Sequence, residues 1–170
     1  MPLGFEAAAP DRESAVAEDD RLQLRLWLRL LTCTDLIENE VRGRLRSEFA
    51  TSLPRFDVLA QLERARDGMT LSALSSRLMV SNGNVTGLVE GMVRDGLVER
   101  RANPADGRSA LISSTAVGHA LFARMAPTHQ AWIDGLMGGM SRAEMVLLLE
   151  LLGKLKQSVQ GGGAWKPFLV

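Results

Sequence analysis

Apolar residues recur every three or four positions along most of this chain, the spacing of amphipathic helices. One such stretch covers about residues 22–49, and a second begins at Pro54, whose missing N–H is harmless in a first helical turn. A third covers about residues 115–138, and a last one begins where Ser141 and Glu144 have the spacing of a capping box. The pattern predicts a mainly α protein.

Two shorter helices are predicted in the middle of the chain, joined by a turn at Met79 and Val80. Thr70 is placed to cap the first and Ser81 the second, because a hydroxyl there accepts a bond from an unpaired N–H. Gly96 suits the left-handed position that ends the second helix. The expected buried faces are Leu71, Leu74 and Leu78 on the first helix, and Val85, Leu88, Val89, Met92 and Val93 on the second.

A small β-hairpin is predicted to follow. Residues 97–101 alternate as a strand does, residues 110–112 are expected to be the returning strand, and the Asn, Pro, Asp and Gly between them favour a turn. Helix, turn, helix and hairpin in this order are the layout of a winged helix-turn-helix, in which a helix meets base edges and a loop meets the backbone.

The second short helix begins with small polar residues that a purely buried helix does not need. Each glycine there costs about 1 kcal/mol relative to alanine. Asparagine can pair with adenine, and threonine with phosphate or a thymine methyl. Three arginines lie in the hairpin. The predicted DNA-contacting residues are Ser81, Asn82, Gly83, Asn84, Thr86, Gly87, Arg100, Arg101 and Arg108. The alternatives are a solvated helix face and a hairpin whose arginines pair with Glu99 and Asp106.

Several segments together resemble the multiple-antibiotic-resistance regulator (MarR) family. They are Leu71-Ser-Ala-Leu, Val80-Ser-Asn-Gly-Asn-Val-Thr-Gly-Leu-Val, Asp95-Gly-Leu-Val-Glu-Arg, and the hairpin residues Asp106 and Arg108. The resemblance covers about residues 22–159 and implies a winged helix-turn-helix repressor of double-stranded operator DNA. The chain has Gly107 where the family has arginine, so the wing tip has one cation fewer. It also has Ser114 where the family has leucine, before the next helix.

Charge and composition divide the chain. Residues 1–20 hold one arginine and six acidic residues and are expected to form a disordered tail, although the whole chain has a net charge of zero. A MarR-like domain is expected at about 21–160, with dimerisation helices at about 21–50 and 115–160, the winged helix-turn-helix at about 54–113, and a tail at 161–170.

The first and last long helices are apolar over more of their surface than one neighbour would cover. The last carries Met145, Leu147, Leu148, Leu149, Leu151, Leu152 and Leu155. Large exposed apolar patches mark interfaces, so an obligate two-fold homodimer is expected, which would place two reading helices about one DNA turn apart. The alternative is a bundle that buries these faces within one chain.

The family resemblance also implies a small-molecule effector, similar to those of regulators of hydroxycinnamate and other aromatic-acid catabolism. An aromatic acid or its CoA thioester suits apolar walls with one or two cations. The implied effector residues are Trp27, Leu31, Arg46, Arg55, Phe56, Met125, His129 and Trp132. Each of them could instead be an ordinary core or surface residue.

Other functions find less support in the sequence. No apolar run is long enough for a membrane helix, and no Cys/His set or nucleophile–base set indicates a metal, a cofactor or an enzyme. The lone Cys33 fits a reducing cytoplasm. It also leaves open a redox-sensing regulator, although a thiol among leucines is expected to be unreactive. A winged-helix module that binds proteins instead of DNA is the remaining alternative.

Overall fold

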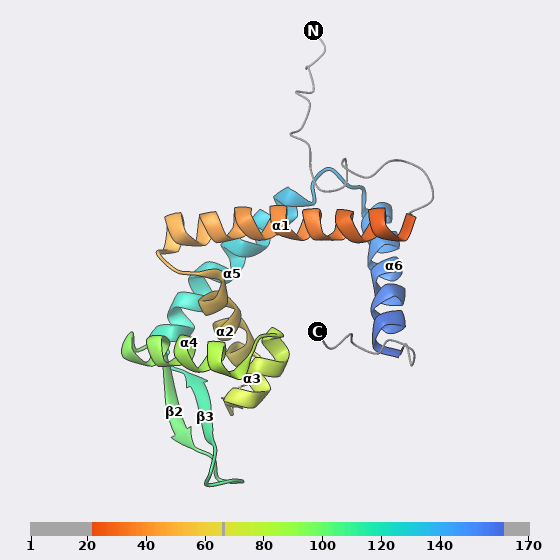
Figure 1. Ribbon diagram of the computed structural model, residues 1–170. Coiled ribbons are helices and arrows are strands. Elements are labelled where there is room, and N and C mark those ends of the chain that lie inside the picture. The colour runs from red at the N-terminus through yellow and green to blue at the C-terminus, as the bar shows by residue number, and fades with distance from the viewer. Residues whose placement is uncertain (1–21, 66, 162–170) are drawn as a thin grey trace. The chain divides into compact units, whose positions relative to one another are not determined.

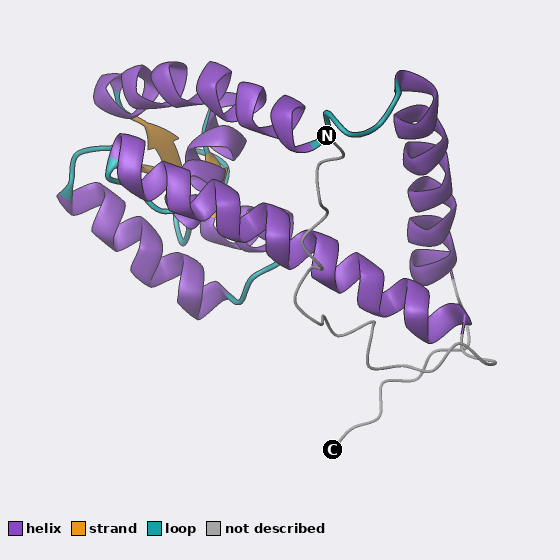
Figure 2. Ribbon diagram, turned by 90° about the horizontal axis from the view of Figure 1, so that it is seen from above, coloured by secondary structure: helices purple, strands orange, loops and turns teal. Residues whose placement is uncertain are grey.

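The computed structural model describes residues 22–65 and 67–161, so the tail expected at 1–20 and residues 162–170 lie outside the described chain. The chain divides into two units, and the boundary falls between Gln130 and Ala131. The elements are α1 (Leu22–Phe49), α2 (Leu53–Glu63), β1 (Met69–Thr70), α3 (Leu71–Leu78), α4 (Asn82–Arg94), β2 (Val98–Ala102), β3 (Ala110–Ser114), α5 (Ala116–Leu136) and α6 (Arg142–Gly161) (Figure 1). Helix predominates, as the sequence predicts (Figure 2).

The strands form one antiparallel sheet in the order β1-β3-β2. Ile112 at its centre pairs with Met69 on one side and Arg100 on the other, and its side chain is fully buried. The predicted hairpin is therefore confirmed, and β1 is an addition. A strand of two residues is too short to show alternation, which is why its sequence gave no signal.

The core of the first unit is built from α1, α2, α3, α4, α5 and the sheet. Its fully buried side chains are Leu45, Val58, Leu59, Leu62, Leu74, Val85, Val89, Met92, Val98, Ile112 and Met125. These include Leu74, Val85, Val89 and Met92 of the faces predicted from spacing. The prediction was wrong for Val93, which is 38% exposed because it lies at the edge of the apolar stripe of α4.

Hydroxyl groups cap the starts of both α3 and α4, as expected, and a further one holds the turn between the two helices. Thr70 Oγ1 accepts from the N–H of Ala73 at 3.2 Å, and Ser81 Oγ accepts from the N–H of Asn84 at 3.4 Å. The buried Ser75 adds a bond from its hydroxyl to the carbonyl of Val80 at 2.6 Å. Met79 ends α3 with φ 55°, a left-handed conformation that favours glycine.

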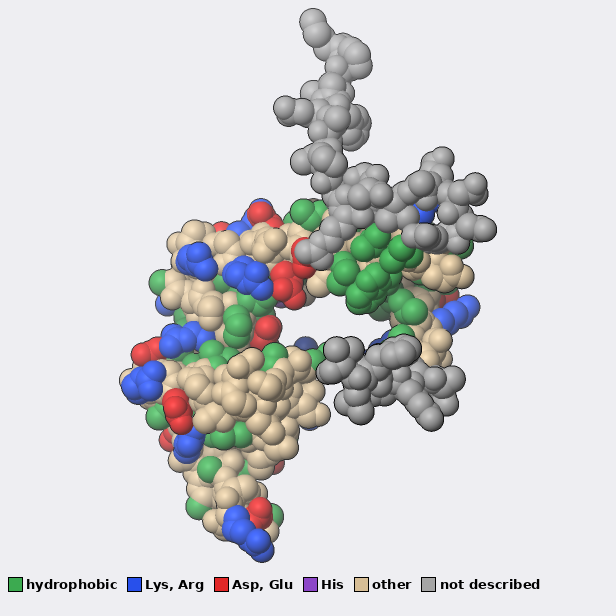
Figure 3. Space-filling model, in the orientation of Figure 1, with side chains coloured by type: hydrophobic (Ala, Val, Ile, Leu, Met, Phe, Trp, Pro, Cys, Tyr) green, Lys and Arg blue, Asp and Glu red, His purple; other side chains and the backbone are tan. Residues whose placement is uncertain are grey.

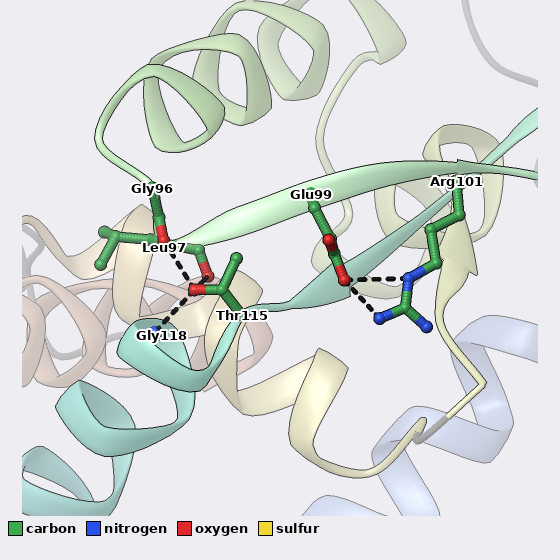
Figure 4. A network of polar contacts seen from close by, with 6 residues as sticks. All are labelled: Gly96, Leu97, Glu99, Arg101, Thr115 and Gly118. Carbon is green, nitrogen blue, oxygen red and sulfur yellow. Dashed lines mark hydrogen bonds and ion pairs between the residues drawn. The ribbon is translucent and has the colours of Figure 1, made fainter.

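The root of the hairpin is tied to α5 (Figure 4). The Thr115 hydroxyl donates to the carbonyl of Gly96 at 2.6 Å and accepts from the N–H of Gly118 at 3.1 Å. Gly96, which directly follows the C-cap residue Asp95 of α4, has φ 69°, the left-handed conformation that was predicted. A Cβ on Gly118 would lie 2.0 Å from the carbonyl oxygen of Leu97, so only glycine allows this approach. The hairpin therefore leaves the helices in a fixed direction.

The long helices α1 and α6 bury little of their apolar surface within one chain. On α1, Val41 and Leu45 are buried, whereas Leu22, Leu26, Trp27 and Leu36 toward its N-terminus are exposed. On α6, which opens with the predicted capping box between Ser141 and Glu144, no described residue is buried. None of the helices in the described chain is long and apolar enough to cross a membrane.

Candidate nucleic-acid interface

The start of α4 presents a small, polar and open surface. Asn82, Gly83, Asn84 and Gly87 are exposed, and a Cβ built on either glycine would meet nothing within 4 Å. Thr86 is half-buried and donates its hydroxyl to the carbonyl of Asn82 at 2.8 Å, so its hydroxyl proton is used within the helix. The described chain therefore gives no packing reason for glycine at positions 83 and 87.

The hairpin β2–β3 projects away from α2, α3 and α4 (Figure 1). Its tip is shaped by two side chains that accept from the backbone: Asn103 Oδ1 from the N–H of Ala105, and Asp106 Oδ1 from the N–H of Arg108, both at 3.0 Å. The space-filling view shows basic and acidic side chains gathered at this tip (Figure 3). These local bonds fix the tip before any partner arrives.

The three hairpin arginines differ in how they are held. Arg101 donates to the carboxylate of Glu99, as the ordinary-hairpin interpretation expected (Figure 4). Arg100 lies 3.8 Å from a carboxylate oxygen of Glu90 on α4. The pair considered between Asp106 and Arg108 takes another form, because the carboxylate contacts the backbone N–H. Within the described residues, the guanidinium of Arg108 has no ion pair.

The C-terminal end of α4 is anchored to α2 by an ion pair between Arg55 Nη2 and Asp95 Oδ2. Arg55 lies across the surface of α4, since a Cβ on Gly91 would be 3.5 Å from its Nη2. The sequence alone does not reveal this pair, because its members are 40 positions apart and each looks like an ordinary surface charge. Arg55 therefore helps to position the helix whose start carries the candidate DNA contacts.

Two of the eight candidate effector residues, Phe56 and His129, are in contact in the first unit. The rings of Phe56 and His129 stack with centroids 4.5 Å apart, Phe122 lies on Phe56 at 5.6 Å, and Met125 is fully buried. Burial lowers the pKa of His129, so its imidazole is neutral at pH 7. Phe56 is 7% exposed, so in the single chain Phe56 and Met125 are part of the core, whereas Phe122 and His129 are half-buried beside them.

Arg46 and Arg55 share a second place. They line an open depression of about 460 Å³ together with Ala50, Thr51 and Ser52, at the start of α2. Trp27 and Leu31 lie on the N-terminal half of α1 and do not line it. Trp132 is buried and belongs to the second unit. The eight residues therefore do not form one site within the first unit.

Cys33 is exposed on α1, which corrects the expectation that its thiol would be shielded among leucines. The leucines near Cys33 in the sequence lie on other sides of α1 and leave its thiol exposed in the single chain. In the described part of the chain, no group of three or more His, Cys, Asp or Glu side chains is arranged to hold a metal ion.

Comparison with known proteins gives consistent relatives. The sequence profile of the MarR family matches residues 51–109. The HTH-type transcriptional repressor YetL of Bacillus subtilis is 31% identical over 82% of this chain and 83% of its own length. The transcriptional activatory protein BadR of Rhodopseudomonas palustris is 30% identical over 85% of each chain.

A crystal structure of a mutant MarR from E. coli complexed with operator DNA matches with a TM-score of 0.72 and 25% identity, over 78% of this chain and 94% of that one. These relatives are transcriptional regulators and not enzymes. The winged-helix fold, the family profile and the extended similarity to YetL lead to one conclusion: the chain belongs to the MarR family of transcriptional regulators.

Proposed function

We propose that the protein is a cytoplasmic, homodimeric repressor that binds a specific operator through α4 and the β2–β3 hairpin. The observation that carries this proposal is the open face at the start of α4, where Asn82 and Asn84 are exposed and the described chain gives no packing reason for Gly83 and Gly87. A DNA groove explains them, because small residues allow close approach and asparagine amides read base edges. The complex of the E. coli MarR mutant with operator DNA supports the same use of the fold.

Within this interface, Asn82, Asn84 and Thr86 are the candidates for base contacts. Ser81, Gly83 and Gly87 allow the helix backbone to approach. The wing contributes Arg100, Arg101 and Arg108, of which Arg108 is the candidate for the minor groove because it is exposed at the tip and its guanidinium has no ion pair among the described residues. Arg101 must break its ion pair with Glu99 before it can bind a phosphate, so it contributes less to DNA affinity than Arg108 does.

The dimer is supported by apolar surface that one chain leaves open. Leu148 and Leu152 of α6 are 40% and 38% exposed, and Leu26 and Trp27 of α1 are 51% and 55% exposed. Burying a fully exposed large apolar side chain contributes roughly 1.5–3 kcal/mol. These partly exposed side chains contribute less each, so a stable pair needs many of the exposed apolar residues of α1 and α6 from both chains to offset the cost of association. Two-fold symmetry then presents two copies of α4 to one face of the DNA.

For the effector we propose an aromatic acid or its CoA thioester, with Arg46 or Arg55 holding its anionic group at the start of α2. The two guanidinium groups on one open depression support this choice, as does the positive end of the α2 dipole. Because Arg55 also pairs with Asp95, an anion that draws Arg55 away would loosen the end of α4. Ligand binding and DNA binding would thus oppose each other.

Repression is the part of this proposal that the relatives leave open, since YetL is named as a repressor and BadR as an activatory protein. In vitro transcription from the promoter nearest the operator decides between the two. Added protein is expected to lower transcript yield, and an aromatic acid or thioester to restore it. A rise in transcript on adding protein alone would contradict the repressor.

DNA binding itself is tested by selecting duplexes from a random pool and measuring affinity across a range of salt. Asn84→Ala is expected to cost about 1–3 kcal/mol on the selected operator and much less on random duplex. Equal losses of affinity on the operator and on random duplex would mean that Asn84 contacts the DNA phosphate backbone and not a base. If no salt-dependent binding is found, the fold serves as a protein-interaction module.

A thiol-based regulator is the second candidate, and the exposure of Cys33 favours it. Measuring operator binding before and after mild peroxide treatment distinguishes a thiol-based regulator from a ligand-responsive one, with Cys33→Ser as the control. Loss of binding in the wild type and not in the variant would support redox sensing.

A further inference from the structure

A cavity of about 400 Å³ lies in the first unit between α2, the end of α3 and the start of α4. Its wall is mainly apolar and consists of Pro54, Leu78, Val80, Val85 and Leu88, together with the polar side chains of Asp57 and Asn84. This volume and this composition, apolar with a few polar groups, are those of sites for small organic molecules. It is distinct from the depression that Arg46 and Arg55 line.

The carboxylate of Asp57 is the unusual element of this wall. It is half-buried, and among the residues that the structure describes it has no hydrogen-bond or ion-pair partner. Burial of the carboxylate and, to a smaller extent, the negative charge of Glu38 on α1 raise the pKa of Asp57 to about 6. At neutral pH the cavity therefore holds an anionic group that pairs with no cation among the described residues, and a bound cation would stabilise it.

Asn84 links the cavity to the open face of α4. Its side chain is exposed, lines the cavity, and has no hydrogen-bond partner within the described chain. Its amide oxygen is a second acceptor for an ammonium group. A molecule that holds this amide would keep it from a base edge.

We propose that this cavity binds a small molecule with an apolar body and a positively charged amine, which pairs with Asp57 and displaces Asn84 from DNA. The apolar wall takes up the hydrocarbon part, and the ammonium group lies against Asp57. The effect on DNA rests on the function proposed above, whereas the binding site itself does not. Such an amine is a different chemical class from the anion expected near Arg46.

The test uses the free full-length protein and calorimetric titration with three probes of similar shape: 2-phenylethylamine, 2-phenylethanol and 3-phenylpropionate. The amine is expected to bind at least about tenfold more tightly than either other probe, which is the ratio that one charge-assisted contact supplies. Equal binding of the alcohol, tighter binding of the propionate, or no binding of the amine would overturn the proposal.

Variants locate the site. Asp57→Asn keeps the shape and removes the charge, so the amine affinity should fall about tenfold. Asp67→Asn, an exposed aspartate outside the cavity, is the matched control and should bind as the wild type does. Val80→Trp, a change at an exposed wall residue, should block the cavity and abolish amine binding with Asp57 intact. Amine binding unchanged in Asp57→Asn or Val80→Trp would contradict the assignment.

The DNA arm is measured separately. With the selected operator, the amine is expected to weaken binding of the wild type and to have no effect on Asp57→Asn. If the protein binds no DNA but still binds the amine through Asp57, the site stands and the proposed function fails. If it binds DNA and the amine leaves the affinity unchanged, the displacement of Asn84 is wrong.

Discussion

Arg55 of α2 forms an ion pair with Asp95, the residue that ends α4. Their side chains are 28% and 49% exposed, so water screens the pair, and its contribution to the free energy of unfolding is about 0.5–1 kcal/mol. The ion pair matters because it connects the depression at the start of α2, which Arg55 lines, to α4, the helix that carries the candidate DNA contacts.

The ion pair predicts different results for two neighbouring arginines. Arg46→Ala should remove the response to an aromatic acid and leave operator affinity intact, because no ion pair of Arg46 to α4 is present among the described residues. Arg55→Ala should remove the response and also lower operator affinity. Anisotropy titrations of labelled operator with and without ligand measure both quantities.

A double-mutant cycle with Asp95→Ala tests the connection. The coupling energy in operator binding is expected to be about 0.5–1 kcal/mol, since either single change breaks the same contact. Additive losses would mean that the ion pair does not position α4.

Asp57 predicts a pH dependence of stability. Its pKa is about 6 in the folded protein and 3.8 as the ordinary value, so the folded state binds the proton more tightly than the unfolded state. Stability should therefore fall as pH rises from about 4 to about 6 and level off above that window. Asp57→Asn should leave stability nearly unchanged at pH 4 and raise it by about 1 kcal/mol at pH 7.5, an effect reduced by partial exposure. Urea titrations at both pH values measure this, with Asp67→Asn expected to show no such difference.

The exposed leucines of α6 predict a dimer that a charge can break. Leu152→Asp would place a carboxylate in the proposed interface at a cost of several kcal/mol. Sedimentation should show a dimer for the wild type and a monomer or misfolded protein for the variant. Gln157→Asp, at a polar position of the same helix, is the control and should stay dimeric. A wild type that sediments as a monomer at micromolar concentration would refute the two-fold assembly.

Sequence predicts those features of this fold that depend on neighbouring residues. The caps Thr70 and Ser81 and the box of Ser141 and Glu144 form as expected, because each needs a hydroxyl or carboxylate within three positions. Helical periodicity predicts α1, α4 and α5, and turn residues predict the hairpin. The open start of α4 follows from its small residues.

Contacts between distant positions are what the sequence could not supply. The pair of Arg55 with Asp95, the raised pKa of the half-buried Asp57 and the strand β1 depend on how α2, α4 and the sheet pack. The sequence also does not show which hairpin arginines form ion pairs. In the structure Glu99 pairs with the guanidinium of Arg101, whereas Asp106 accepts from the backbone N–H of Arg108. The roles of the site residues stay predictions until DNA and ligand binding are measured.

The most direct test of the central claim is a bulky substitution at Gly87, measured for folding and for DNA binding together. A Cβ at Gly87 meets nothing within 4 Å, so Gly87→Leu should stabilise α4 by about 0.8 kcal/mol through helix propensity. Gly43→Leu, at an exposed glycine of α1 with equally open surroundings, is the matched control. If α4 enters the major groove, Gly87→Leu is more stable yet binds the selected operator at least about tenfold more weakly, a loss of 1.4 kcal/mol or more, while Gly43→Leu binds as the wild type does. Wild-type affinity for the operator in a correctly folded Gly87→Leu protein would contradict the account.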